Sequence, residues 1–183
     1  MSTDLLLFHW LYGPQSHVWL ATMSVLTVVG SGWTMIPIAA LAGFKRTRDH
    51  ALWLVALLAL VAIAVFSIKL VVGRARPCTS LAEVHALVFH APTDPSFPSG
   101  HAAGAFAVAA FVTFELAVHP LAKVALFVVA AGIALSRVAL GVHFPSDVLA
   151  GALLGTVAAL LVSASRKSFL KRKWNAKRAQ SIL

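Results

Sequence analysis

Long uninterrupted runs of apolar residues dominate the pattern of this chain. Five of them reach the roughly 17–25 residues that a helix needs to cross a bilayer, and they cover residues 18–44, 51–72, 98–118, 121–142 and 145–165. Strands are disfavoured because these runs show no alternation of apolar and polar positions. The pattern therefore predicts an all-α integral membrane protein, a helical bundle of five transmembrane spans.

The segments between and beside these runs differ in length and polarity. The apolar segment 5–12 is too short to span, and its Trp and Tyr among aliphatic residues predict a helix lying in the membrane interface, so that residues 1–17 form an interfacial segment. The links between spans are short except for the polar loop 73–97, and connections of this length usually have a function or are disordered. A basic tail follows at 166–183, and one domain is expected to cover residues 1–183.

Composition supports a membrane protein and argues against a nucleic-acid partner. The chain is 60% hydrophobic and only 11% charged, whereas soluble domains carry about 25% charged residues. A net charge of +9 could suggest nucleic acid, but seven of the fifteen basic residues lie after Ser165 and the others flank apolar runs. That distribution is typical of membrane orientation. The single cysteine, Cys78, excludes an intrachain disulfide.

Six ionisable residues at the ends of the spans are predicted to reach one face of the membrane. They are Lys69 and Arg76 after the second span, His101 at the start of the third, Arg137 near the end of the fourth, and His143 and Asp147 at the start of the fifth. The third span crosses away from that face and the fourth returns to it. Each residue alone has an ordinary explanation, such as a snorkelling lysine or an interfacial histidine. Six on one face favour a single site.

The chemistry of this cluster suits a phosphate group. Its three cations are Lys69, Arg76 and Arg137. Guanidinium groups match phosphate oxygens in a bidentate manner, and a lysine adds a point charge. The third span begins Pro-Ser-Gly-His, and the free N–H groups of a helix N-terminus bind anions. Here Ser99 offers a hydroxyl donor, and Gly100 permits close approach of the backbone.

Two histidines and one carboxylate complete the predicted site. His143 and Asp147 are four residues apart, so the carboxylate can accept a hydrogen bond from one ring nitrogen and leave the other free to attack phosphorus. His101 could then protonate the departing oxygen as a general acid. These parts fit in-line phosphoryl transfer through a phosphohistidine, with fixed cations stabilising the charge. Since no cluster of acidic residues could hold a metal, we expect neither a metal nor another cofactor.

Three motifs in this region resemble those of the type 2 phosphatidic acid phosphatase superfamily. Residues 69–77 are similar to its K-x6-R-P motif, residues 98–101 to its P-S-G-H motif, and residues 136–147 to its S-R-x5-H-x3-D motif. The resemblance implies a nucleophile, an orienting carboxylate and a general acid at His143, Asp147 and His101. It implies phosphate binding by Lys69, Arg76, Ser99, Gly100 and Arg137. It also implies metal-independent action on lipid phosphates or diphosphates.

The short N-terminal segment and the residues before P-S-G-H look most like the bacterial undecaprenyl-diphosphate phosphatases. The resemblance thus implies hydrolysis of undecaprenyl diphosphate to undecaprenyl phosphate. The alternatives are a phosphatidic acid or phosphatidylglycerol phosphate phosphatase, a lipid phosphotransferase, or a non-enzymatic carrier of anionic lipids. A nucleophile, an orienting carboxylate and an acid argue against the carrier, because binding needs only the cations. The oligomeric state is left open.

The distribution of basic residues predicts the orientation of the chain. Four basic residues lie on the side of the site: Lys69, Arg74, Arg76 and Arg137. Eleven lie on the other side: Lys45, Arg46, Arg48, Lys123, Arg166, Lys167, Lys171, Arg172, Lys173, Lys177 and Arg178. Loops rich in Lys and Arg stay in the cytoplasm. We therefore expect a multi-pass protein of the bacterial cytoplasmic membrane, with a cytoplasmic C-terminus, an extracytoplasmic loop 73–97, and a site facing outward.

Overall fold

The computed structural model describes residues 3–13, 16–31, 48–87 and 91–180, and within these ranges the secondary structure is entirely helical. The helices are α1 (Thr3–Leu11), α2 (His17–Val29), α4 (Arg48–Val72), α5 (Pro77–Ser80), α6 (Gly100–Glu115), α7 (Pro120–Ala139) and α8 (Pro145–Gln180). The predicted all-helical class is confirmed. The predicted interfacial segment contains α1, and the long loop 73–97 contains the short helix α5.

Three stretches in the described part of the chain are long and apolar enough to cross a membrane: Asp49–Ser80, Pro120–Ala139 and Pro145–Gln180. Helices α2 and α6 are apolar but shorter. The 16 residues of α6 extend about 24 Å, less than the roughly 30 Å of a hydrocarbon core. Part of the predicted first span, 32–44, lies outside the described residues. The count of five spans therefore stays a prediction.

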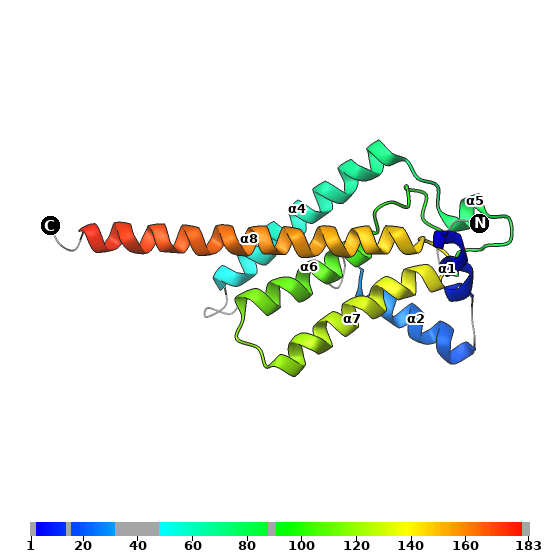
Figure 1. The fold of residues 1–183 in the computed structure, drawn as a ribbon, viewed down its shortest axis with the longest axis horizontal. Coiled ribbons are helices and arrows are strands. Elements are labelled where there is room, and N and C mark those ends of the chain that lie inside the picture. Colours follow the sequence, from blue (N-terminus) through cyan, green and yellow to red (C-terminus); the bar gives the residue numbers. More distant parts are fainter. Residues whose placement is uncertain (1–2, 14–15, 32–47, 88–90, 181–183) are drawn as a thin grey trace.

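Helix α6 lies inside the bundle, where it packs against α4, α7 and α8 (Figure 1). Its contact with α8 is close because α8 presents glycines. A Cβ added at Gly151 would lie 2.4 Å from the carbonyl oxygen of Ser99, and one added at Gly155 would lie 2.1 Å from that of Ala103. Small residues of this kind let helix backbones approach within a membrane. The close approach brings the start of α6 beside the start of α8.

One end of the bundle collects the segments that carry the predicted chemistry. Helices α1 and α5 lie there beside the end of α7 and the start of α8 (Figure 1). Helix α1 is anchored by Phe8, which is fully buried in a cluster with Val84, Val138 and Phe144. An apolar cluster therefore packs at this end of the bundle, beside the polar groups.

Helix α8 runs away from that end and projects beyond the other helices (Figure 1). It has 36 residues, about 54 Å of helix, which exceeds the thickness of a hydrocarbon core. The predicted basic tail 166–183 is thus helical as far as Gln180, a continuation of the last predicted span. The basic residues of α8 beyond Ser165 lie at the end of the molecule opposite the polar groups.

Candidate active site

Arg76 joins two segments that are distant in sequence. Helix α4 ends at Val72, and Gly73 follows it with a φ of +60°, a conformation that glycine adopts readily. The chain then turns, and the buried Arg76 donates from Nη1 to the carbonyl of Val142 at 2.8 Å and to Nε2 of His143 at 3.1 Å. Its Nε donates to the carbonyl of Asp94 at 2.7 Å. Arg76 thereby ties the loop before α6 to the turn between α7 and α8.

The contacts of His143 determine its tautomer. A guanidinium only donates hydrogen bonds, so Nε2 of His143 must accept from Arg76, and the proton of the neutral ring lies on Nδ1. Nδ1 lies 3.5 Å from Oδ2 of Asp147, as the four-residue spacing predicted, although this separation is longer than an ordinary hydrogen bond. Nε2 therefore carries the lone pair of the neutral ring, and in this structure that lone pair accepts the hydrogen bond from Arg76.

The charge state of His143 suits a nucleophile. The residue lies between α7 and α8 and is only 2% exposed. Burial, against the opposing effect of Asp147 and with the help of Arg76 and Arg137, lowers the pKa of His143 to about 4. The imidazole is therefore neutral at neutral pH, and the ring keeps the lone pair that attack on phosphorus requires.

Asp147 is held through both carboxylate oxygens. It is fully buried in the first turn of α8, where Oδ2 accepts from the backbone N–H of Phe144 at 2.9 Å. Oδ1 accepts from Nη1 of Arg74 at 2.6 Å. The backbone N–H of Ser99 donates to the carbonyl of Asp147 at 3.0 Å, which links the starts of α6 and α8. Arg74 has no phosphate role in the sequence interpretation, and the structure shows it bound to this carboxylate.

Arg137 is buried in the last turn of α7 and is held from α2. Its carbonyl accepts from the backbone N–H of His143 at 3.2 Å, and its Nη1 donates to Oγ1 of Thr27 at 2.8 Å. Thr27 also lies 3.1 Å from Oγ of Ser136. Sequence reasoning missed Thr27, for which a hydroxyl within an apolar run was the only signal.

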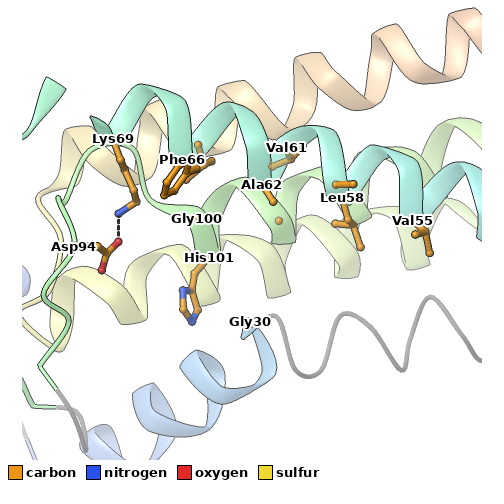
Figure 2. Close-up of a pocket in the computed structure, with 13 residues that line it drawn as sticks. Gly30, Val55, Leu58, Val61, Ala62, Phe66, Lys69, Asp94, Gly100 and His101 are labelled. Atoms are coloured by element: carbon orange, nitrogen blue, oxygen red, sulfur yellow. Dashed lines mark hydrogen bonds and ion pairs between the residues drawn. The ribbon is translucent and has the colours of Figure 1, made fainter. Parts of the chain in front are cut away.

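The start of α6 borders a cavity of about 600 Å³. Ser99 caps the helix by accepting from the N–H of Ala102, and its hydroxyl proton can still be donated. A Cβ added at Gly100 would meet only Val65, at an ordinary contact distance of 3.7 Å, so the backbone here is not crowded. Gly100, His101 and Lys69 line one end of the cavity (Figure 2).

The rest of the cavity is apolar and runs along α4. Figure 2 shows the side chains of Phe66, Ala62, Leu58 and Val55 following one another along that helix, away from Lys69. The cavity thus has a charged end at Lys69 and Asp94 and an apolar length that lies among the candidate spans. This shape suits a molecule with a phosphate head and a long apolar tail.

Asp94 is a site residue that sequence reasoning placed only in the long loop. Its Oδ2 accepts from Nζ of Lys69 at 2.6 Å, and its Oδ1 accepts from Nη2 of Arg76 at 3.0 Å. Burial raises the pKa of this carboxyl, but the hydrogen bond from Lys69 and the charge of Arg76 outweigh burial and hold the pKa of Asp94 below its ordinary value. An acid shortly before P-S-G-H was the signal available in the sequence.

The structure brings the predicted residues into one region, by contacts of different kinds. Side-chain contacts connect Lys69, Arg76, His143 and Asp147, with Asp94 as the bridge between the first two. Backbone hydrogen bonds attach Ser99 and Arg137, and the shared cavity places Gly100 and His101 beside Lys69. The catalytic and binding roles of these residues stay predictions.

Residues 50–170 match the model of the family described as the PAP2 superfamily. The chain belongs to the PAP2 superfamily. An undecaprenyl-diphosphatase of Sulfolobus acidocaldarius is 34% identical over 135 residues, which are 73% of this chain and 64% of the relative. A decaprenylphosphoryl-5-phosphoribose phosphatase of Mycobacterium tuberculosis is 36% identical over 149 residues, 78% of this chain and of that relative. The chain thus spans less than two thirds of the Sulfolobus protein.

Two solved structures share this architecture. LpxE of Aquifex aeolicus superimposes with a TM-score of 0.78 at 28% identity, covering 88% of this chain and 95% of that one. A transmembrane phosphatidylglycerolphosphate phosphatase of Bacillus subtilis gives the same TM-score at 24% identity, covering 90% of this chain and 85% of that one, and shows the fold alone. The candidate membrane spans described above, in a chain of the PAP2 superfamily, indicate a multi-pass membrane protein.

Proposed function

We propose that this PAP2 protein hydrolyses lipid phosphates or diphosphates without a metal, through a phosphohistidine. The observation that carries the proposal is the setting of His143. The ring is buried and neutral, Nε2 faces the guanidinium of Arg76, and Nδ1 faces the carboxylate of Asp147. A nucleophile, its orienting group and a cation for the phosphoryl oxygens are thus adjacent.

The proposed reaction has two steps. Nε2 of His143 attacks the terminal phosphorus while the bond from that phosphorus to the leaving oxygen breaks, and His101 donates its proton to the leaving oxygen. That oxygen is the ester oxygen of a lipid monophosphate or the bridging oxygen of a lipid diphosphate. A water molecule then attacks the phosphohistidine, His101 takes the proton of this water, and His143 is released with inorganic phosphate. Lys69, Arg76 and Arg137, with the N–H groups at the start of α6, stabilise the charge on the equatorial oxygens.

For the substrate we propose undecaprenyl diphosphate, which loses one phosphate to become undecaprenyl phosphate. The cavity supports a long apolar tail, because its lining beyond Lys69 is apolar along α4. The names of the two relatives contain undecaprenyl and decaprenylphosphoryl, which are polyprenyl groups. The second candidate substrate is phosphatidylglycerol phosphate or phosphatidic acid. The Bacillus subtilis protein that shares this fold is named as a phosphatidylglycerolphosphate phosphatase.

The proposed orientation places the site outside the cytoplasm of a bacterial cell. The basic residues of α8 beyond Ser165 support this orientation, since they lie at the end of the molecule away from the site (Figure 1). In a Cys78→Ser background, an impermeant thiol reagent should label Glu83→Cys in intact cells and Lys173→Cys only after lysis. Both positions are exposed. Labelling in the reverse order would show that the site faces the cytoplasm.

The experiment that tests the function is phosphate release by the purified full-length protein in detergent. The panel contains undecaprenyl diphosphate, phosphatidic acid and phosphatidylglycerol phosphate, each at matched surface concentration. Turnover should be fastest with undecaprenyl diphosphate and absent in His143→Ala. His17→Ala is the matched control, because His17 is exposed at the start of α2. Activity of His143→Ala equal to that of the parent protein would overturn the mechanism.

A further inference from the structure

We infer that Asp4 of α1 and Arg74 are positioning residues that hold the Asp147 carboxylate in the geometry needed to orient His143. The inference rests on the proposed function, because it concerns the nucleophile and orienting carboxylate of that mechanism. It adds a role for the N-terminal helix, which the sequence interpretation assigned only to the membrane interface. The basis is a continuous set of contacts from α1 to Asp147.

Arg74 lies at the centre of these contacts. Its Nη1 donates to Oδ1 of Asp147 and to Oγ of Ser146, both at 2.6 Å, and its Nη2 donates to Oδ2 of Asp4 at 2.7 Å. The side chain of Asp147 has no exposed surface, so its charge depends on such partners. Both terminal nitrogens of Arg74 therefore hold carboxylates, in contrast to the phosphate role proposed for Arg76.

Asp4 fixes the other side of this arrangement. Its Oδ1 accepts from the backbone N–H of Ser146 at 2.9 Å, and its Oδ2 accepts from Oγ of Ser146 at 2.7 Å. Ser146 lies in the first turn of α8, where a negative charge is favourable. Burial raises the pKa of Asp4, but the hydrogen bonds from Arg74 and Ser146 outweigh burial and lower it. Asp4 is therefore ionised at neutral pH.

An aromatic contact reinforces the same connection. The guanidinium carbon of Arg74 lies 4.2 Å from the ring centroid of Phe144, and the ring of Phe8 in α1 lies 5.5 Å from it. The backbone N–H of Phe144 donates to Oδ2 of Asp147. Each oxygen of Asp147 is thus held by a group that α1 contacts: Oδ1 by Arg74, and Oδ2 by Phe144.

This arrangement has a kinetic consequence that differs from that of a phosphate ligand. If Arg74 and Asp4 position Asp147, their loss should leave phosphate binding intact, because Lys69, Arg76 and Arg137 remain. Their loss should slow the chemical step, because Asp147 no longer holds the His143 ring in the attacking orientation. The readout is therefore the effect on kcat compared with the effects on KM and on inhibition by vanadate, a phosphate analogue.

The test compares Asp4→Asn, Arg74→Ala and Arg74→Lys with Glu83→Gln in the purified full-length protein. Glu83→Gln changes a second carboxylate beside α1, whose Oε1 lies 3.8 Å from Nε2 of His9 and whose side chain is exposed. We expect Asp4→Asn and Arg74→Ala to lower kcat by about tenfold to a hundredfold. KM and vanadate inhibition should stay within about twofold of the parent values. Arg74→Lys should recover part of the loss, and Glu83→Gln should match the parent.

A double variant tests whether Asp4 acts through Arg74. If it does, Asp4→Asn combined with Arg74→Ala should lower kcat no further than Arg74→Ala alone, since coupled residues are not additive. Multiplied effects would show that Asp4 acts independently. Melting temperatures accompany the kinetics. If Asp4→Asn fails to fold, Ser146→Ala takes its place, because it removes a partner of both Asp4 and Arg74 without exposing a buried charge.

The outcomes separate this inference from the proposed function. A parent-like kcat in Asp4→Asn and Arg74→Ala, alongside an inactive His143→Ala, would overturn the inference and leave the proposed function standing. Vanadate inhibition that weakens in parallel with kcat in Arg74→Ala would show that Arg74 is a phosphate ligand and would also overturn it. An active His143→Ala would overturn the proposed function, whatever the behaviour of Asp4 and Arg74.

Discussion

Nη1 of Arg76 lies 3.1 Å from Nε2 of His143, although 67 residues separate them in the chain. The contact places a fixed positive charge beside the atom proposed to attack phosphorus. The same guanidinium can therefore stabilise the neutral ring before reaction and the phosphoryl oxygens during it. Because Arg76 cannot accept a hydrogen bond, the contact also selects the Nδ1–H tautomer, which faces Asp147.

Replacement of His101 should affect substrates according to their leaving group. In the proposed mechanism His101 protonates the departing oxygen, so His101→Ala should slow the hydrolysis of lipid phosphates by roughly a hundredfold to ten-thousandfold. A substrate with a good leaving group, such as p-nitrophenyl phosphate, needs no such proton and should retain slow turnover. His143→Ala should be inactive with both. Acid-labile phosphate trapped on His101 instead of His143 would contradict these roles.

Activity should survive chelation of metals. Three fixed cations, Lys69, Arg76 and Arg137, are proposed to carry the charge stabilisation that metals supply elsewhere. Phosphate release by the purified protein should therefore be the same with and without EDTA, and vanadate should inhibit it by imitating the five-coordinate transition state. A loss of activity on chelation that added Mg²⁺ restores would show that a metal takes part.

The acidic limb of the pH profile should lie well below the ordinary pKa of histidine. Attack requires the neutral form of His143, whose pKa is lowered from 6.5 to about 4. With an activated substrate, which does not need His101, kcat/KM should hold from neutral pH down to about pH 5 and then fall as His143 takes up a proton. A limb near pH 6.5 would contradict the buried setting of this ring.

The lowered pKa of His143 also predicts how the stability of the folded protein changes with pH. The unfolded chain binds a proton on His143 below about pH 6.5, whereas the folded chain binds it only below about pH 4. Between these values the unfolded state holds more protons, so this group's contribution to stability decreases as the pH falls through the window. The melting temperature of His143→Gln should therefore depend less on pH between 6.5 and 4 than that of the parent protein. An equal dependence would contradict this assignment.

Asp94 should compete with phosphate for the cations of the site. Its carboxylate pairs with both Lys69 and Arg76, which are proposed to bind phosphate. Asp94→Asn removes that negative charge and keeps the shape, so vanadate should inhibit this variant at a lower concentration than the parent. Glu83→Asn, a change at an exposed position of the same loop, is the control. Weaker inhibition in Asp94→Asn would mean that Asp94 chiefly orients the cations.

The contact between α6 and α8 should be sensitive to one added methyl group. At Gly155 a Cβ would lie 2.1 Å from the carbonyl oxygen of Ala103, so Gly155→Ala must push the two backbones apart. Such overpacking costs about 1–3 kcal/mol, and the melting temperature should fall. At Gly104 of α6 a Cβ would meet nothing within 4 Å, so Gly104→Ala should leave the melting temperature unchanged or raise it. Equal effects of the two changes would contradict this packing.

The sequence determined the helical class, most helix positions and the residues of the proposed site. Apolar run length sets where helices lie, and the predicted run 121–142 differs from α7 by at most three residues at either end. The four-residue spacing of His143 and Asp147 could be interpreted directly, because His143 lies in the bend that leads into α8 and Asp147 lies in the first turn of that helix, so the two stay close along the chain. Short-range geometry of this kind depends only on the local backbone.

Only the tertiary structure decided which residues hold the site together. Asp94 bridges Lys69 and Arg76, Thr27 holds Arg137, and Asp4 reaches Arg74 across 70 residues of chain. No periodicity in the sequence marks these pairs, because each contact depends on how closely and at what angle separate helices pack. That packing depends on features such as the glycines of α8, whose effect appears only when α6 lies against them. A carboxylate or a hydroxyl in the sequence therefore has no assigned partner until the helices are assembled.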